Sequence, residues 1–431
     1  MPTLQVVTLG CSKNTVDTEH LLYQVWSVYE TVPEGFEGPV DVLLVNTCGF
    51  IGDAKEQSIQ TILSAVERKK AGQVGRLLVF GCLSQRYADE MPGLIPEVDG
   101  WFGARDLDPL VRALGCTPDH ASAHKRVRTD GRHPYAFLKI SEGCDRRCSY
   151  CAIPFIRGPH KSVPMEVLVA EAEDLAAKGV RELVVIAQDT TFYGLDLYGR
   201  RALAELLRKL SAVEGIEWIR IHYSYPADFP EDVLEVMAHN PKVCKYLDIP
   251  LQHISDPVLD RMRRHVDGSW TRALIARLRR EVPGVVLRTT MIVGHPGETQ
   301  EAFGELLGFV REARFERLGA FMYSEEEGTW GAEHFADDVP PQVKQERLDA
   351  LMDLQREISL EYNRSRVGSE LTVMVDAFLP EGGAVARSEF ESPEVDGEIL
   401  VRGVAPSVRV GDMIRVRIVA AEEYDLVAEA I

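Results

Sequence analysis

The stretch that decides the fold is residues 137–154, FLKISEGCDRRCSYCAIP, in which an apolar strand-like run leads into three closely spaced cysteines. These are Cys144, Cys148 and Cys151, and their pattern is C-x3-C-x2-C. A structural zinc takes four ligands, and an ordinary iron–sulfur cluster is held by four cysteines. Three thiolates therefore leave one metal position open, which indicates a 4Fe–4S cluster whose fourth iron can bind a substrate or a reagent.

A second set of three cysteines is dispersed along the N-terminal part of the chain. Cys11 lies in TLGCSKN, Cys48 in VNTCGF and Cys82 in VFGCLSQ. Each follows an apolar run rich in Val, Leu and Thr, which is typical of a buried parallel strand. Ligand sites in open α/β sheets form at the carboxyl ends of the strands, so the three thiols are expected to converge. This triad predicts a second cluster with an open iron.

The runs around the two triads predict a mixed α/β chain in three parts. Residues 1–116 are typical of an open parallel α/β sheet, and residues 135–365 contain about six βα units that indicate a partial (βα)6 barrel with its site at the carboxyl strand ends. Residues 366–431 are strand-rich and predict a small antiparallel β-barrel. The polar, basic segment 117–134 is expected to be a solvated linker, and a long helix is expected at about 342–366.

The composition excludes several classes of protein. Acidic side chains number 67 against 48 basic ones, a formal net charge of −19, which disfavours a general nucleic-acid binder. MPTLQVVTLG lacks the basic start and long apolar core of a signal peptide, and no apolar run approaches the ~20 residues that span a membrane. The sequence thus predicts a cytoplasmic protein with reduced thiols, in which Cys116 and Cys244 are structural.

The compact triad, with its spacing and its place after the first predicted barrel strand, resembles the radical S-adenosylmethionine (SAM) superfamily. The resemblance implies that the amino and carboxyl groups of the methionine moiety chelate the open iron and that Tyr150 lies near the adenine. It also implies that an electron from the cluster cleaves the sulfonium to give a 5′-deoxyadenosyl radical. A zinc site with His160 as the fourth ligand remains an alternative, although zinc has no need of the surrounding barrel.

The N-terminal motifs narrow the resemblance to the methylthiotransferases, over essentially the whole chain. LGCSKN, VNTCGFI and GCLSQRY ahead of a radical triad, with a small terminal barrel, are similar to that family. The resemblance implies that Cys11, Cys48 and Cys82 hold an auxiliary 4Fe–4S cluster whose open iron carries the transferred sulfur. It also implies that the last 66 residues are a TRAM domain, which recognises the substrate.

Within that family the chain resembles the branch that modifies the β-carbon of an aspartate in ribosomal protein S12. The runs that carry this resemblance are LGCSKNTVDTE, CSYCAIP with IRG, AQDTTFYGLDLYG and YLDIPLQH. It implies S12 as the partner, free or within the small ribosomal subunit, together with a low-potential electron donor and a sulfur donor. The alternatives are methylthiolation of a tRNA adenosine by the same chemistry and, in another class, a two-cluster electron carrier or scaffold.

The charge of the predicted terminal barrel supports a protein partner. From Arg366 onward there are six arginines, no lysine and thirteen acidic residues, a balance that would repel a phosphate backbone and attract a basic protein. The four acids expected to contact the partner are Glu389, Glu391, Glu394 and Asp396, with a solvated hairpin as the alternative. Changes at these acids are expected to leave SAM cleavage untouched.

The residues expected to bind SAM lie at the carboxyl ends of the predicted barrel strands. They are Gln188, Asp189, Arg288, Gly294 and Glu298. A helix cap is the alternative for the first two. An arginine inside a barrel is costly unless paired, so Arg288 is expected to meet a carboxylate of the protein or of the methionine. Between the last two, His295 departs from the aromatic usual in the family and is interpreted as one ring replacing another.

Overall fold

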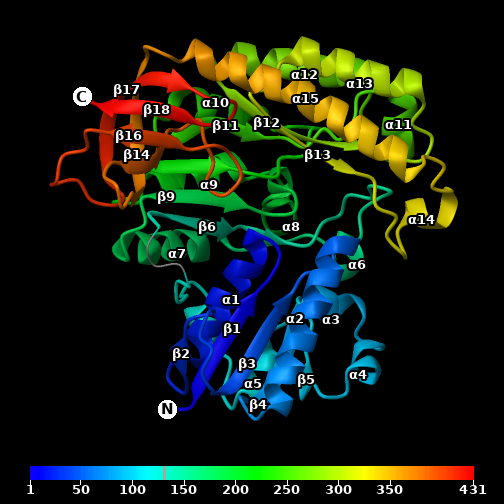
Figure 1. Cartoon of the computed structure of the whole chain (residues 1–431), viewed down its shortest axis with the longest axis vertical. Helices are drawn as coiled ribbons and strands as arrows, with labels where there is room; N and C mark the ends of the chain where they lie inside the picture. Colours follow the sequence, from blue (N-terminus) through cyan, green and yellow to red (C-terminus); the bar gives the residue numbers. More distant parts are fainter. Residues whose placement is uncertain (130–132) are drawn as a thin grey trace. The chain divides into compact units, whose positions relative to one another are not determined.

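The computed structural model describes residues 1–129 and 133–431, which form two compact units (Figure 1). The first holds the N-terminal sheet together with residues 141–146 and 151–171. The second holds residues 147–150, the strand β6 (Tyr135–Lys139) and everything from Ala172 onward.

A five-stranded parallel sheet forms the first unit, in the order β2-β1-β3-β4-β5, which confirms the open α/β sheet predicted from the sequence. The short strand β2 was not predicted, since its three residues, ETV, carry no clear pattern. The strands are β1 (Thr3–Thr8), β2 (Glu30–Val32), β3 (Val40–Thr47), β4 (Val74–Gly81) and β5 (Gly100–Trp101). A separate two-stranded antiparallel sheet pairs β7 (Ser141–Glu142) with β8 (Lys161–Ser162). The helices are α1 (Ser12–Val25), α2 (Gly52–Lys70), α3 (Cys82–Arg86), α4 (Met91–Leu94), α5 (Asp108–Ala113), the 3-10 turn η1 (His120–Ser122) and α6 (Ile153–Arg157).

The junction of β4 with α3 brings two cysteine-bearing strand ends together. Cys48 directly follows β3, and Cys82 directly follows β4. Gly81 between β4 and Cys82 has φ +103°, and a Cβ there would lie 2.4 Å from Asn46 Oδ1 and 2.7 Å from Thr47 O. Only glycine tolerates both this backbone and this close approach, so it lets α3 start beside the end of β3.

The second unit contains a six-stranded parallel sheet whose order, β13-β12-β11-β10-β9-β6, follows the sequence, as expected of a parallel barrel that does not close. All six strands were predicted. Besides β6 they are β9 (Glu182–Ile186), β10 (Trp218–Ile221), β11 (Val243–Asp248), β12 (Val286–Val293) and β13 (Arg317–Met322). Helix α7 (Met165–Ala177) begins in the first unit and ends in the second, which resumes at Ala172. The other helices are the 3-10 turn η2 (Thr190–Phe192), α8 (Leu195–Tyr198), α9 (Leu203–Ser211), α10 (Glu231–His239), α11 (Asp256–Arg261), α12 (Gly268–Glu281), α13 (Gln300–Ala313), α14 (Trp330–His334) and α15 (Pro341–Ser365). The predicted long helix is α15, which packs against β13 and α13 (Figure 1).

The terminal segment of the second unit is a closed five-stranded barrel, β14-β15-β16-β18-β17. Its strands are β14 (Glu370–Phe378), β15 (Ala384–Arg387), β16 (Ile399–Arg402), β17 (Met413–Ala421) and β18 (Leu426–Ala430). The expectation of an antiparallel barrel holds for every pair except β16 with β18, which is parallel. That pair skips β17, which pairs with β14 and β18 instead, and no local pattern indicates this order.

The segment expected to be a solvated linker is in part buried. Arg126 is 1% exposed, and its guanidinium lies 3.4 Å from both Glu19 and Glu171 within the first unit. The prediction of a solvated connector is therefore wrong at this position, because the charge is paired rather than hydrated. No helix in the described ranges is long and apolar enough to cross a membrane.

Candidate active site

The three dispersed thiols lie together at the carboxyl edge of the N-terminal sheet, as predicted. Cys11 is exposed, Cys48 half-buried and Cys82 buried. A Cβ on Gly10, the neighbour of Cys11, would lie 3.1 Å from Cys48 Sγ. Burial raises the pKa of Cys48 and of Cys82, that of Cys82 to about 11, and the charge of Cys11 raises both further. The close approach of Gly10 to Cys48 and the effect of Cys11 on the other two thiols indicate that the three lie near one another.

An arginine that the sequence analysis did not single out completes this site. Arg157, at the end of α6, is buried and donates from Nε to Cys82 Sγ at 3.2 Å. Its Nη1 lies 2.7 Å from Asp17 Oδ2 and 3.1 Å from Glu142 Oε2, and its Nη2 donates to Asn14 Oδ1. The guanidinium therefore brings a charge-assisted hydrogen bond to one sulfur and is itself neutralised by two carboxylates. In the sequence, Arg157 stands out only as part of the IRG run, residues 156–158.

The donor set at this edge fits an iron–sulfur cluster. It consists of three thiols and no imidazole, and three sulfur ligands leave one iron open. Within residues 1–129 and 133–431, no three His, Cys, Asp or Glu side chains are arranged around a single metal-ion position. A raised thiol pKa implies that Cys82 releases a proton when a metal binds, because thiolate is the ligand form.

The compact triad lies in one loop, with Cys144 and Cys151 in the first unit and Cys148 in the second. Cys144 N donates to Gly158 O at 3.0 Å, which fixes the start of the loop. His160, the ligand required by the zinc alternative, has its Nε2 3.0 Å from Ser162 Oγ.

Cys148 has a buried arginine of its own. Arg264 is 3% exposed, and its Nη1 donates to Cys148 Sγ at 3.4 Å and to Tyr150 Oη at 3.3 Å. Its Nη2 donates to Pro250 O at 2.6 Å, and its guanidinium lies 4.2 Å from the centroid of the Tyr225 ring. Burial acts to lower the pKa of Arg264, but Tyr150, Cys148 and Tyr225 raise it above its ordinary value, so the side chain is a permanent cation. Each triad thus has one sulfur that accepts from a buried arginine.

The residues expected near SAM lie in or just after strands of the six-stranded sheet, and Arg288 is the third residue of β12 rather than at its carboxyl end. Asp189, just beyond β9, accepts from Thr191 N at 2.9 Å, so it has the helix-cap role given as its alternative. Gln188 beside it is half-buried. Arg288 Nη1 lies 2.8 Å from Asp248 Oδ1, so its partner is a carboxylate of the protein.

The backbone at this edge is strained in a way that the sequence did not reveal. Tyr223 and Gln252, which follow β10 and β11, have φ of 58° and 74°, a region uncommon for residues other than glycine. Gln252 Oε1 is buried and has no hydrogen-bond partner among the described residues. An amide oxygen left in this state suits a ligand that carries an ammonium or an adenine amine, as SAM does.

The GHPGE loop after β12 is held by internal contacts. Glu298 is buried and accepts from Gly294 N and from Arg347 Nη1, the latter at 3.1 Å. His295 is buried with its ring edge-on to Tyr323, at 5.0 Å between centroids, and burial lowers its pKa to about 4. The neutral ring therefore replaces one aromatic by another, as interpreted from the sequence. Roles of Gly294 and Glu298 in cofactor binding remain predictions.

The remaining predictions concern two thiols outside the triads and the acids between β15 and β16. Cys244 is buried among apolar side chains, with a pKa raised by burial to about 12, and Cys116 packs against the N-terminal core, so both are structural thiols. The prediction that the acids between β15 and β16 form a partner surface is wrong for Glu391, which is 1% exposed and paired with Arg366 and Arg317. Asp396 has a side chain 2% exposed.

Three family models match successive parts of the chain. They are the uncharacterized protein family UPF0004 at residues 3–103, the radical SAM superfamily at residues 138–310 and the TRAM domain at residues 367–431.

Similar curated proteins carry one shared name, ribosomal protein uS12 methylthiotransferase RimO. The protein from Porphyromonas gingivalis is 52% identical over 99% of both chains, and that from Bacteroides fragilis is 48% identical over 100% of this chain and 99% of its own. Among solved structures, the radical SAM methyltransferase TsrM from Kitasatospora setae has a TM-score of 0.54 at 16% identity, over 77% of each chain. The cobalamin-dependent SAM radical enzyme OxsB has a TM-score of 0.53 at 13% identity, over 83% of this chain and 56% of its own. These two likenesses concern the fold alone.

Proposed function

Because the chain belongs to the RimO family of radical SAM methylthiotransferases, we propose that it adds a methylthio group to the β-carbon of an aspartate in ribosomal protein uS12. The observation that carries the proposal is the gathering of Cys11, Cys48 and Cys82 at one strand edge, in a chain that also has the compact radical triad. An electron carrier has no need of the six-stranded sheet of the second unit, which we term the radical sheet.

Two 4Fe–4S clusters, when bound, supply the electron that cleaves SAM and an iron on which the transferred sulfur is held. We assign the first task to Cys144, Cys148 and Cys151 and the second to Cys11, Cys48 and Cys82. Arg264 and Arg157 each donate to one of these sulfurs, which orients the thiolate and stabilises its negative charge. The strained turns at Tyr223 and Gln252 provide the polar edge against which SAM is bound.

We divide the work among residues 1–116 for the auxiliary sulfur, 135–365 for the radical chemistry and 366–431 for the TRAM domain, with 117–134 as the connection. Cleavage of SAM takes up one electron and the product gains a sulfur atom, so we propose a low-potential one-electron donor and a sulfur donor as partners. A ribosomal protein as substrate places the activity in the cytoplasm.

The test is mass spectrometry of uS12 and of bulk tRNA from a strain that lacks the gene, complemented with wild-type protein or with Cys48→Ala. Methylthiolated uS12 is expected only with the wild type, and tRNA is expected to be the same in all strains. A methylthio group on tRNA that depends on this gene, with uS12 unmodified, would assign the chain to the tRNA branch instead.

The electron-carrier alternative is tested on the purified protein. A Cys11→Ala, Cys48→Ala, Cys82→Ala variant, reduced in the presence of SAM, is expected to form 5′-deoxyadenosine but no methylthio product. Absence of 5′-deoxyadenosine from the wild type as well would leave a carrier or scaffold as the better description.

A further inference from the structure

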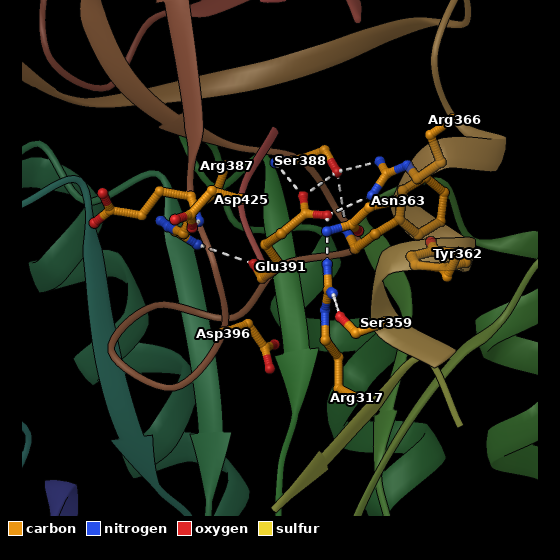
Figure 2. A network of polar contacts seen from close by, with 12 residues as sticks. Arg317, Ser359, Tyr362, Asn363, Arg366, Arg387, Ser388, Glu391, Asp396 and Asp425 are labelled. Carbon is orange, nitrogen blue, oxygen red and sulfur yellow. Dashed lines mark hydrogen bonds and ion pairs between the residues drawn. The ribbon is translucent and has the colours of Figure 1, made fainter. Parts of the chain in front are cut away.

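The segment 387–396, which we term the plug segment, leads from the end of β15 towards β16 and contacts all six strands of the radical sheet. Figure 2 shows part of it, with Arg387, Ser388, Glu391 and Asp396 labelled. Tyr135, Glu182, Arg288 and Arg317 lie in the amino-terminal halves of their strands, and Arg220 and Tyr246 lie in the carboxyl-terminal halves. The pairs are Tyr135 (β6) with Glu394, Glu182 (β9) with Arg387, Arg220 (β10) with the carbonyls of Ser388 and Glu389, Tyr246 (β11) and Arg288 (β12) with Asp396, and Arg317 (β13) with Glu391.

The charges on these strands are buried, and the plug segment supplies partners for them. Arg220 is fully buried and pairs with Glu182 Oε1 of the same sheet at 2.8 Å, and the plug segment adds two carbonyl acceptors to it. Arg317 is 6% exposed, and its carboxylate partner comes from the plug segment. Arg317 Nη2 lies 3.3 Å from Glu391 Oε1 (Figure 2). Arg387 Nη1 lies 2.7 Å from Glu182 Oε2. A buried charge that loses its partner is strongly destabilising. The radical sheet is therefore electrostatically incomplete without the terminal barrel.

One of these contacts continues through the sheet towards the candidate SAM site. Asp396 accepts from Tyr246 Oη at 2.7 Å and lies 3.9 Å from Arg288 Nε. Arg288 Nη1 in turn lies 2.8 Å from Asp248 Oδ1, and Asp248 Oδ2 accepts from Tyr223 N at 3.0 Å. The path runs from the plug segment through β12 and β11 to the turn after β10.

That turn ends beside a cysteine of the compact triad. Tyr223 has the left-handed φ of 58°, which persists only where surrounding contacts enforce it, and Asp248 provides two of them through Tyr223 N and Ser224 N. Two residues after Tyr223, Tyr225 Oη lies 3.9 Å from Cys148 Sγ and donates to Arg264 O at 2.8 Å.

We propose that the plug segment is a positioning element for the SAM site, in which Asp396 acts through Arg288 and Asp248 on the turn of residues 223–225. The terminal barrel is then required for SAM cleavage itself, even when no protein substrate is present. The inference rests on the proposed function, since it takes SAM as the ligand of this edge. It reverses the expectation from the sequence that changes in this segment leave SAM cleavage untouched.

The test compares three variants of the full chain after anaerobic cluster reconstitution. Asp396→Asn keeps the side-chain size and an acceptor for Tyr246 but removes the charge that faces Arg288. Asp396→Glu is the conservative variant, and Glu381→Gln is the control, since Glu381 is an exposed acid in the turn between β14 and β15. The measurements are KM and kcat for SAM cleavage without protein substrate, iron per chain, the melting temperature and amide hydrogen exchange of residues 222–225.

Asp396→Asn is expected to raise the KM for SAM about tenfold, equivalent to about 1.4 kcal/mol, and to speed exchange at residues 222–225. Asp396→Glu should recover most of both effects. A purely structural role would instead lower the folded fraction, and with it iron content and apparent kcat, at an unchanged KM. Wild-type KM and wild-type exchange in Asp396→Asn, or the same KM change in Glu381→Gln, would overturn the proposal.

A milder variant covers the case in which Asp396→Asn does not fold. Tyr246→Phe removes only the hydroxyl that orients Asp396 and is expected to raise the KM in the same direction by a smaller factor. An unchanged KM in Tyr246→Phe would then count against the proposal. None of these measurements involves uS12, so a failure to modify uS12 would refute the proposed function but not the positioning role of the plug segment. An unchanged KM for SAM would refute the positioning role but not the proposed function.

Discussion

Replacing Glu391 by glutamine should destabilise the second unit by about 3 kcal/mol at neutral pH. The carboxylate is 1% exposed, contacts Arg366 and Arg317, and accepts from Ser388 N at 3.0 Å. Although burial alone would raise its pKa, the two guanidiniums bring it from the ordinary 4.5 to about 2. A shift of that size corresponds to about 3.4 kcal/mol, close to the roughly 3–5 kcal/mol lost when one partner leaves a buried ion pair.

The assay is equilibrium urea unfolding followed by circular dichroism, with Glu394→Gln as the matched control. Glu394 lies in the same segment but is exposed and accepts one hydrogen bond, from Tyr135 Oη at 2.9 Å, so its replacement should cost about 1 kcal/mol or less. Because the folded pKa of Glu391 is lowered, its contribution is present above pH 4.5 and disappears as the pH falls towards 2. A loss below about 1 kcal/mol, or one equal to that of the control, would refute the argument from burial.

Three further predictions concern the clusters and the loop near them. Replacing Cys144, Cys148 and Cys151 together with alanine should leave about half of the iron in the anaerobically reconstituted protein, measured by iron assay, and loss of all iron would contradict two independent clusters. His295→Phe should remove part of the loss of stability that acid causes. The folded pKa of His295, about 4, lies below the ordinary 6.5, so the wild-type free energy of unfolding should fall by up to about 3 kcal/mol between pH 6.5 and pH 4. Urea titrations measure this, and a pH profile unchanged by the substitution would speak against a neutral packed ring. Arg264→Gln removes a cation 3.4 Å from Cys148 Sγ and should shift the reduction of that cluster to a more negative potential in an EPR-monitored titration, whereas the buried Cys244→Ser should leave the potential unchanged.

The sequence predicted those features whose cause is local. The strands that precede Cys48 and Cys82 are apolar runs, and a cysteine directly after a strand must lie at the carboxyl edge of the sheet whatever the tertiary packing. Convergence of the dispersed triad follows from that rule alone. The parallel sheet of the second unit was predicted for the same reason, since each of its strands carries its own pattern.

Features that depend on distant partners could not be predicted from the sequence. Arg157 meets Cys82 across 75 positions and Asp17 across 140, and Arg264 meets Cys148 across 116, so no local pattern distinguishes these arginines from solvated ones. The charge count of the terminal barrel predicted a partner surface that includes Glu391, and this was wrong because the partners of Glu391 are distant in the sequence. A sum of charges treats every acid as exposed, whereas this one is buried between two arginines.

The parallel pairing of β16 with β18 bears on how the protein is made. The terminal barrel cannot close until β18 has been synthesised, about a hundred residues after the last strand of the radical sheet. At ribosomal speeds of about 5–20 residues per second, that sheet waits roughly 5–20 s for the complete barrel, whose Glu391 is the carboxylate partner of Arg317. The nascent enzyme therefore passes through a stage that is open to chaperones and proteases, and a premature stop that removes only β18 should leave the radical sheet unfinished as well.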